Sequence, residues 1–153
     1  MSSRLRCSCL VVVGLALGVV GGSILRAGNQ PPAHPHAGQF AECAKECAVC
    51  MNACASCYHH CAGLVQAGKQ DHAAVMNMCN DCTELCAGAA KVTSRQGPLA
   101  VLTCDACAKA CDQCLAACEK FPDDPHMAAC AKECKDCAKA CRDMISHVSG
   151  SQP

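Results

Sequence analysis

Cysteine is the residue type in this sequence that could carry the most chemistry. Twenty of the 153 residues are cysteine, and eighteen of these lie between residues 43 and 141. They form four runs in which steps of three and four residues alternate: Cys43, Cys47, Cys50, Cys54, Cys57 and Cys61; Cys79, Cys82 and Cys86; Cys104, Cys107, Cys111, Cys114 and Cys118; and Cys130, Cys134, Cys137 and Cys141. This spacing is the a/d pattern of a helix that turns one face toward partner helices. All eighteen thiols are therefore predicted to point toward a shared interior.

Each run lies in a segment that carries its own helix start or stop signals. We expect four helices, over about residues 39–67, 72–93, 98–121 and 125–148. Gly68 is expected to end the first helix, Asp71 to cap the second and Pro98 to open the third. Asp124 and Pro125 open the fourth. Because the connections are short, the sequence predicts an all-α, antiparallel up-down-up-down four-helix bundle with a cysteine-lined core.

Large apolar side chains are too few to fill such a bundle. Residues 38–148 contain only 14 Leu, Ile, Val and Phe residues, and an ordinary bundle core needs more than that. Free cysteine packs as a small hydrophobe, so thiols and alanines must form the interior. The charged residues between the cysteines, such as Lys45, Asp105 and Asp136, then lie on the outer faces of the helices.

Three interpretations of the cysteine runs differ in what the thiols do. The thiols could be small core residues only, but the near exclusion of Leu and Ile from the seam argues against that. They could form disulfides, but cysteines three or four apart on one helix have Cβ atoms about 5–6 Å apart. A disulfide needs about 3.5–4.5 Å, so only bridges between helices would be unstrained. The third interpretation is a store for soft metal ions, which explains why every thiol lies on one face, and we favour it.

Thiolate is a soft ligand that selects Cu(I), Zn(II) or iron–sulfur clusters. Structural zinc sites are isolated sets of four ligands and iron–sulfur sites are compact loops with irregular steps, whereas these cysteines form continuous lines. Cu(I) accepts two or three thiolates, and one monovalent ion per thiolate would leave a neutral interior. We therefore predict a capacity near one Cu(I) per seam cysteine, on the order of 15–20 per chain. A general Zn(II) or Cd(II) buffer is the alternative.

One end of the predicted bundle also gathers histidine and methionine. His72 and Met127 lie on the seam itself, at the same end as Cys61, Cys118 and Cys130. Both side chains can bind soft metals. One hypothesis makes this end the mouth for copper, with His72 and Met127 as accessory ligands, and the other makes them capping and surface residues.

The first 38 residues differ from the rest of the chain. Residues 1–26 combine Arg4 and Arg6 with an apolar run from Leu10 to Val20, which is typical of a signal peptide or membrane anchor. Residues 27–38 form a linker rich in proline and histidine, residues 39–148 form the metal-binding domain and residues 149–153 form a tail. We expect an exported, periplasmic protein, with retention in the membrane as the alternative.

Charge and composition argue against two other classes of function. The net charge is zero, and the residues from Ala27 onward include 10 Lys and Arg and 13 Asp and Glu. This balance argues against a nucleic-acid binder. One Tyr, two Phe and no Trp offer no platform for stacking bases. The sequence contains no recognisable set of nucleophile, base and oxyanion donors, so we expect no enzyme.

Residues 40–148 resemble the four-helix-bundle copper storage proteins of bacteria, a cysteine-rich family. The likeness rests on CAKECAVCMNACASCYHHC, CNDCTELC, CDACAKACDQCLAAC and CAKECKDCAKAC. It implies Cu(I) storage inside the bundle, cysteine ligands along the seam, His and Met ligands at an open end, and a homotetramer of bundles. A copper chaperone or a copper enzyme would be the partner. A disulfide-stabilised structural module is the alternative from another class.

Overall fold

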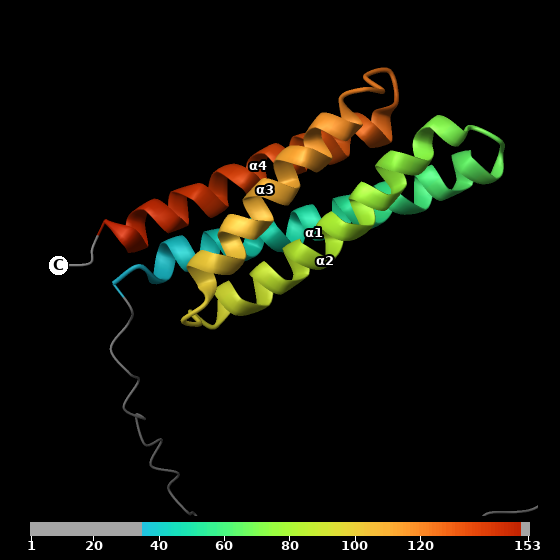
Figure 1. Ribbon diagram of the computed structural model, residues 1–153. Helices are drawn as coiled ribbons and strands as arrows, with labels where there is room; N and C mark the ends of the chain where they lie inside the picture. The colour runs from blue at the N-terminus through green and yellow to red at the C-terminus, as the bar shows by residue number, and fades with distance from the viewer. Residues whose placement is uncertain (1–34, 151–153) are drawn as a thin grey trace, which may run out of the picture. The chain divides into compact units, whose positions relative to one another are not determined.

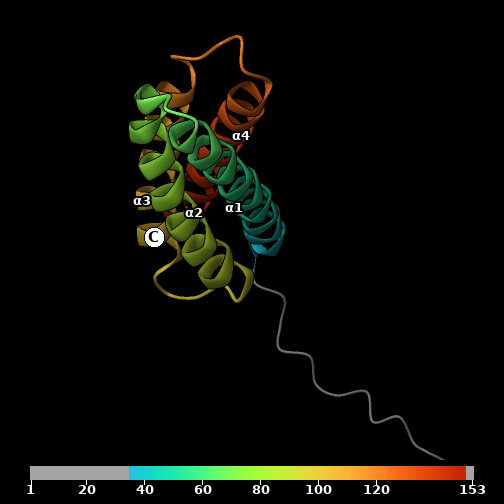
Figure 2. The ribbon, with the colours of Figure 1, turned by 90° about the vertical axis from the view of Figure 1, so that its right-hand side faces the viewer.

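The structure, a computed structural model, describes residues 35–150, and these form four α-helices. They are α1 (Ala37–Gln66), α2 (Ala73–Ser94), α3 (Ala100–Cys118) and α4 (Pro125–Ser149), with a short 3-10 turn, η1 (Gln70–His72), between α1 and α2. The chain reverses direction at each connection, so successive helices run antiparallel (Figure 1). Each helix packs against the two beside it in the ring α1–α2–α3–α4, and Figure 2 shows α2 between α1 and α3. The predicted all-α, up-down-up-down bundle is confirmed.

Two of the predicted helix ends are found where the sequence places them. Gly68, which follows the end of α1, has a φ of +90°, a backbone conformation that glycine adopts without steric cost. Asp124 caps α4, because its carboxylate accepts hydrogen bonds from the backbone N–H groups of His126 at 2.9 Å and Met127 at 3.3 Å. Pro125 follows as the first helical residue.

The predicted start of the second helix is wrong by a short distance. Residues 70–72 form the turn η1, and α2 begins only at Ala73. Asp71 does not cap α2, because its carboxylate accepts a hydrogen bond of 2.8 Å from Nδ1 of His72. The Asp71 side chain, which the sequence suggested as a helix cap, therefore orients the His72 ring instead.

The third helix also begins later than predicted. Gln96 has a φ of 54°, and the N–H of Gly97 donates to the carbonyl oxygen of Val92, so the chain is still closing the end of α2 at these residues. Pro98 therefore lies in the turn, and α3 begins at Ala100.

Only part of the predicted domain division can be placed on the structure. Residues 1–26 and most of the linker 27–38 lie outside the described residues, as do residues 151–153. α1 begins at Ala37, inside the predicted linker, and α4 continues to Ser149. None of the helices in residues 35–150 is both long and apolar enough to cross a membrane.

Small side chains fill the interior of the bundle. All eighteen seam cysteines are buried, together with alanines such as Ala89, Ala108 and Ala138. Larger apolar side chains lie toward the two ends of the core, with Phe40 and Met144 at one end and Met127 at the other. Ion pairs such as Lys109–Asp105, at 2.8 Å between Nζ and Oδ2, lie on the exposed faces. The core is therefore built of sulfur and methyl groups, as the composition predicts.

Candidate metal-binding core

The eighteen cysteines of residues 35–150 are free thiols whose exposure is at most 1%. Their sulfur atoms contact one another across the helices at 3.5–4.0 Å. These separations are far longer than the roughly 2.05 Å of a disulfide bond. The described core is thus a packed line of unlinked sulfur atoms.

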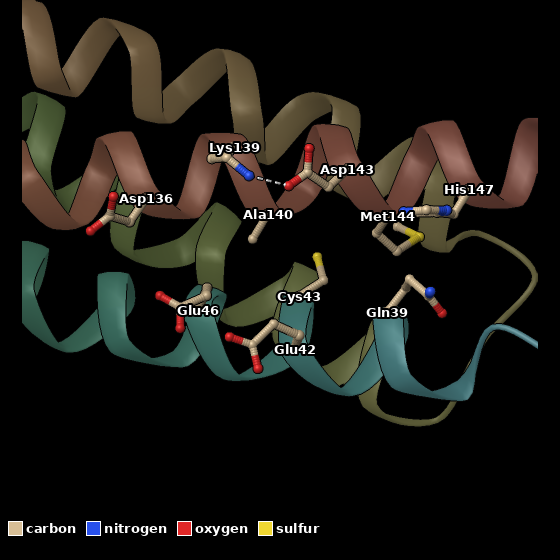
Figure 3. A pocket seen from close by; sticks show the side chains of 10 residues that line it. All are labelled: Gln39, Glu42, Cys43, Glu46, Asp136, Lys139, Ala140, Asp143, Met144 and His147. Carbon is tan, nitrogen blue, oxygen red and sulfur yellow. Dashed lines mark hydrogen bonds and ion pairs between the residues drawn. The ribbon is translucent and has the colours of Figure 1, made fainter.

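The line begins at Cys43, near the start of α1 (Figure 3). The Sγ atom of Cys43 lies 3.5 Å from Sγ of Cys104 and 3.7 Å from Sγ of Cys141. The hydroxyl group of Thr93 lies 3.3 Å from Sγ of Cys104. We did not predict Thr93 as a member of the core, although its position seven residues after Cys86 continues the heptad seam and would have indicated it.

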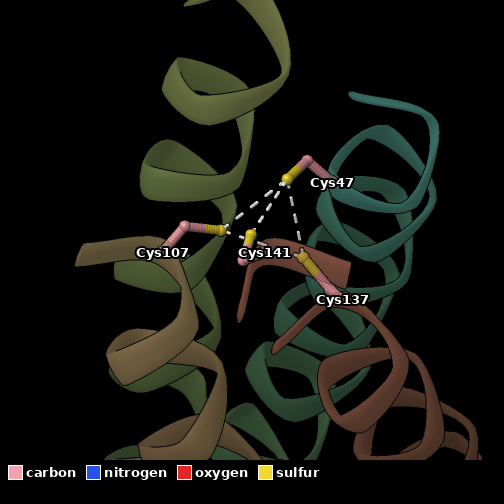
Figure 4. A group of neighbouring side chains, drawn as sticks. All are labelled: Cys47, Cys107, Cys137 and Cys141. Atoms are coloured by element: carbon pink, nitrogen blue, oxygen red, sulfur yellow. Dashed lines mark hydrogen bonds between the residues drawn. The ribbon is translucent and has the colours of Figure 1, made fainter. Parts of the chain in front are cut away.

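A group of four thiols comes next along the axis. Cys47 of α1, Cys107 of α3, and Cys137 and Cys141 of α4 turn their sulfur atoms toward one another (Figure 4). Sγ of Cys47 lies 4.0, 3.7 and 3.6 Å from the sulfur atoms of Cys107, Cys137 and Cys141, respectively. Side chains from three helices thus converge on one small space.

Similar groups of four continue along the core, and in each group the four sulfur atoms lie within 4.8 Å of one another. They include Cys50–Cys82–Cys86–Cys111, Cys50–Cys54–Cys82–Cys134, Cys54–Cys114–Cys130–Cys134 and Cys57–Cys79–Cys118–Cys130. Neighbouring groups share members, such as Cys50, Cys54 and Cys130. The groups therefore cannot all act as separate four-ligand sites, because one thiolate would have to serve two of them.

The two accessory residues predicted at the far end are both buried there. Met127 is fully buried, and the Cys57 thiol donates a hydrogen bond of 3.5 Å to its thioether sulfur Sδ. His72 is 7% exposed, and its ring stacks on Phe121 with the ring centroids 4.2 Å apart. The structure thus places Met127 in contact with a thiol and His72 at the same end of the bundle.

Two further histidines at this end are tied to the cap of α4. Nε2 of His60 lies 2.7 Å from Oδ2 of Asp124, and the His60 ring stacks on His126 with the centroids 4.2 Å apart. These contacts connect the last part of α1 to the start of α4. The sequence alone did not predict this packing, because it depends on which residues of α1 lie beside the start of α4.

Burial and mutual hydrogen bonding shift the pKa values of the thiols. Burial raises the pKa of Cys61 above its ordinary value of 9.0. A hydrogen bond with Cys114 and burial together raise the pKa of Cys79. The pKa of Cys82 shifts in the opposite direction, because neighbouring thiols, Cys111 first among them, hydrogen-bond to its sulfur. Protons are therefore shared unevenly along the line, and those bound to the sulfurs must leave when a metal ion binds.

The spacing of the sulfur atoms suits metal ions held between thiolates. A metal–thiolate bond is about 2.3 Å for zinc, so an ion of similar size reaches two sulfurs that lie up to about 4.6 Å apart. Contacts of 3.5–4.0 Å join sulfur atoms of α1 to those of α3 and α4, and sulfur atoms of α2 to those of α3. An ion can therefore exchange one sulfur for the next without leaving the core.

Comparison with known proteins identifies relatives with the same architecture. A family model described as "Csp: Copper storage protein" matches residues 36–146. A solved Cu(I)-bound copper storage protein, BsCsp3, has a TM-score of 0.63 and 33% identity, and the match covers 69% of this chain and 98% of that chain. A cytosolic copper storage protein from Streptomyces lividans, solved with five coppers, has a TM-score of 0.66 and 25% identity over 72% of this chain and 94% of that chain. No curated protein sequence matches the chain.

The prediction of an exported, periplasmic protein is contradicted by this comparison. The Streptomyces lividans relative is described as cytosolic. The apolar run from Leu10 to Val20, on which the prediction depended, lies outside the described residues.

Proposed function

Because this chain belongs to the copper storage protein family, we propose that its thiol-lined bundle holds a reserve of many Cu(I) ions. The observation that carries the proposal is the core itself, in which eighteen buried free thiols line one axis. Cu(I) is a soft ion that prefers thiolate sulfur. Storage needs many similar sites that exchange ions with one another, and shared groups of thiols provide them.

The charge of the interior favours Cu(I) over a divalent ion. Among the described residues, the buried polar or charged side chains outside the cysteines are His72 and Thr93, so neither lysine nor arginine neutralises a thiolate there. One Cu(I) for each thiolate gives a neutral interior, whereas one Zn(II) for each four thiolates leaves two negative charges at every site. Uncompensated buried charge is costly. A core loaded with Cu(I) ions is therefore more stable than one loaded with Zn(II) ions.

We propose that all eighteen seam cysteines are copper ligands and that His72 and Met127 are accessory ligands at the mouth. The Met127 thioether supports this role by its 3.5 Å contact with the Cys57 thiol. For His72, the hydrogen bond from Nδ1 to Asp71 orients the ring and leaves Nε2 as the ligand atom, which is the usual arrangement of a metal-binding histidine.

The assembly and partners are proposed from the family resemblance. We expect a homotetramer of bundles that exchanges copper with a chaperone or a copper enzyme. Large apolar side chains that are exposed on the single chain, such as Leu99 at 59% and Leu102 at 65%, support a further interface. Light scattering of the purified protein tests the assembly, and a monomer of 15.8 kDa would contradict it.

A titration of the fully reduced protein with Cu(I) in the presence of a competing chelator tests the storage function. We expect saturation at about 15–20 Cu(I) per chain, because nearly every thiolate can hold one ion. As a matched comparison, the protein is first loaded with Zn(II), and Cu(I) should displace all of the zinc. Saturation at about two to four ions, or zinc that resists displacement, would contradict the proposal.

A further inference from the structure

A cavity of about 470 Å³ lies between α1 and α4 at the Cys43 end of the core. Figure 3 shows side chains of both helices around it, with Cys43 contributed by α1 and Met144 and His147 by α4. This is the end of the bundle opposite to His72 and Met127. The cavity therefore offers a second place where the thiol line comes near the surface.

Three soft-metal ligands of different kinds line this cavity. His147 is exposed, whereas Met144 and Cys43 are each only 1% exposed. His147 follows Met144 by three residues, so the two side chains lie on the same face of α4, one turn apart. Imidazole, thioether and thiol are all ligands for Cu(I). Going from solvent inward, the order of ligands is therefore imidazole, then thioether and thiol.

The innermost of these ligands is already part of the core line. Sγ of Cys43 lies 3.5 Å from Sγ of Cys104 and 3.7 Å from Sγ of Cys141. Sγ of Cys141 in turn lies 3.6 Å from Sγ of Cys47, a member of the group in Figure 4. An ion bound to Cys43 thus reaches the storage sites by a single ligand exchange, to Cys104 or Cys141.

The rim of the cavity does not repel a cation. Four carboxylates line it, and three lysines pair with them at 2.6–3.2 Å: Glu42 and Glu46 with Lys45, Asp136 with Lys132, and Asp143 with Lys139. The carboxylates outnumber the lysines, so the rim as a whole carries a small negative charge. The side chain of Ala140 also lines the cavity, and its small size leaves the space above Cys43 open.

We propose that this cavity is a lateral Cu(I) site, in which His147 and Met144 receive Cu(I) from a soft-ligand complex and pass it to Cys43. The inference rests on the proposed storage function and adds a second route to the same thiol line. In the transfer, the bond from copper to the His147 nitrogen breaks as a bond to Sγ of Cys43 forms. The Cys43 thiol releases its proton to water, and copper remains Cu(I) throughout.

The rate of copper loading into the full chain tests the lateral site. A double variant, Met144→Leu with His147→Ala, removes the two outer ligands, and Ala140→Leu narrows the cavity. The matched control, Met51→Leu with His59→Ala, changes the same residue types on α1, at positions that do not line the cavity. With a Cu(I)–chelator complex as the copper source, we expect both lateral variants to load about tenfold more slowly than the control, with unchanged capacity. Loading at the control rate by either lateral variant would overturn the proposal.

A second measurement reports on the site itself and does not depend on the variants. In apo protein labelled at the methionine methyl groups, the first equivalents of Cu(I) should shift the NMR signal of Met144. A Met144 signal that stays unchanged while the core fills would overturn the lateral site and leave the storage function intact. If the unmodified chain saturates at about two to four Cu(I), the storage function fails, and the lateral site fails with it.

Discussion

At the scale of single residues, the core thiols whose pKa is raised keep a proton that copper must displace. The ordinary thiol pKa of 9.0 is raised by burial at Cys61 and by hydrogen bonding with Cys114 at Cys79. In the unfolded chain the same thiols lose their protons near pH 9. A group whose folded pKa is raised stabilises the folded state below its unfolded pKa, and this contribution disappears as the pH rises above that value.

We therefore expect the apo protein to lose stability in alkaline solution. Between about pH 8 and about pH 10, each thiol that ionises only on unfolding removes about 1.4 kcal/mol per pH unit of stability above pH 9. Anaerobic urea denaturation across this range measures the change. The copper-loaded protein is the control, because its thiolates hold no protons, and its stability should not fall. Equal losses in both forms would contradict the raised pKa values.

Most of the core side chains could be predicted from the sequence, because the seam alone determines which side chains point inward. The eighteen cysteines, His72 and Met127 all lie inside the bundle or at its end, as the spacing predicts. The contact between Cys57 and Met127 could not be predicted, since it depends on how far α1 is shifted along α4. Thr93 was missed for a different reason: it continues the seam of α2 with a residue type other than cysteine.

At the scale of helices, α4 stands out because a side chain caps its N-terminus. The Asp124 carboxylate accepts two backbone hydrogen bonds at the N-terminus of α4 and also contacts His60 of α1. Partial burial opposes ionisation of this carboxyl group, but the hydrogen bonds from His60, Met127 and His126 dominate and lower its pKa below 3.8. A lowered pKa means that the cap stabilises the fold above about pH 4 and that this contribution is lost as the pH falls further.

Replacing this cap should weaken the fold without changing the copper ligands. We expect Asp124→Ala to lower the free energy of unfolding by about 1 kcal/mol at neutral pH, because the first N–H groups of α4 lose their acceptor. The neighbouring Asp123→Ala is the matched control, since Asp123 is exposed and lies one residue before the cap. Urea denaturation of the apo proteins measures the difference, and equal stability of the two variants would show that Asp124 does not act as a cap.

Helix ends were predicted well where a local motif decides them and poorly where tertiary contacts do. Gly68 and Asp124 act through their own backbone or side chain, and both predictions are confirmed. Asp71 is of a residue type that often caps helices, but its carboxylate hydrogen-bonds to the His72 ring instead. Pro98 lies in the turn because the chain is still closing the end of α2 at Gln96. A sequence pattern cannot choose between two partners for the same carboxylate.

At the scale of the whole molecule, the bundle has an interior whose thiols can act both as core residues and as metal ligands. The thiols and alanines pack as a close apolar core, as small apolar side chains do. Four helices contribute sulfur atoms to one axis, and groups from α1, α3 and α4 already lie within bonding reach of a shared ion (Figure 4). We therefore infer that metal replaces protons inside a preformed bundle, rather than folding a disordered chain.

A crystal structure of the copper-loaded protein, with copper located by its anomalous scattering, tests this inference most directly. We expect copper positions spaced along the axis of the bundle, each bonded to seam sulfurs of one or two helices, with the four helices arranged as in the apo protein. Copper bound mainly on the outer carboxylate faces, or seam cysteines joined in disulfides with few ions between them, would contradict it.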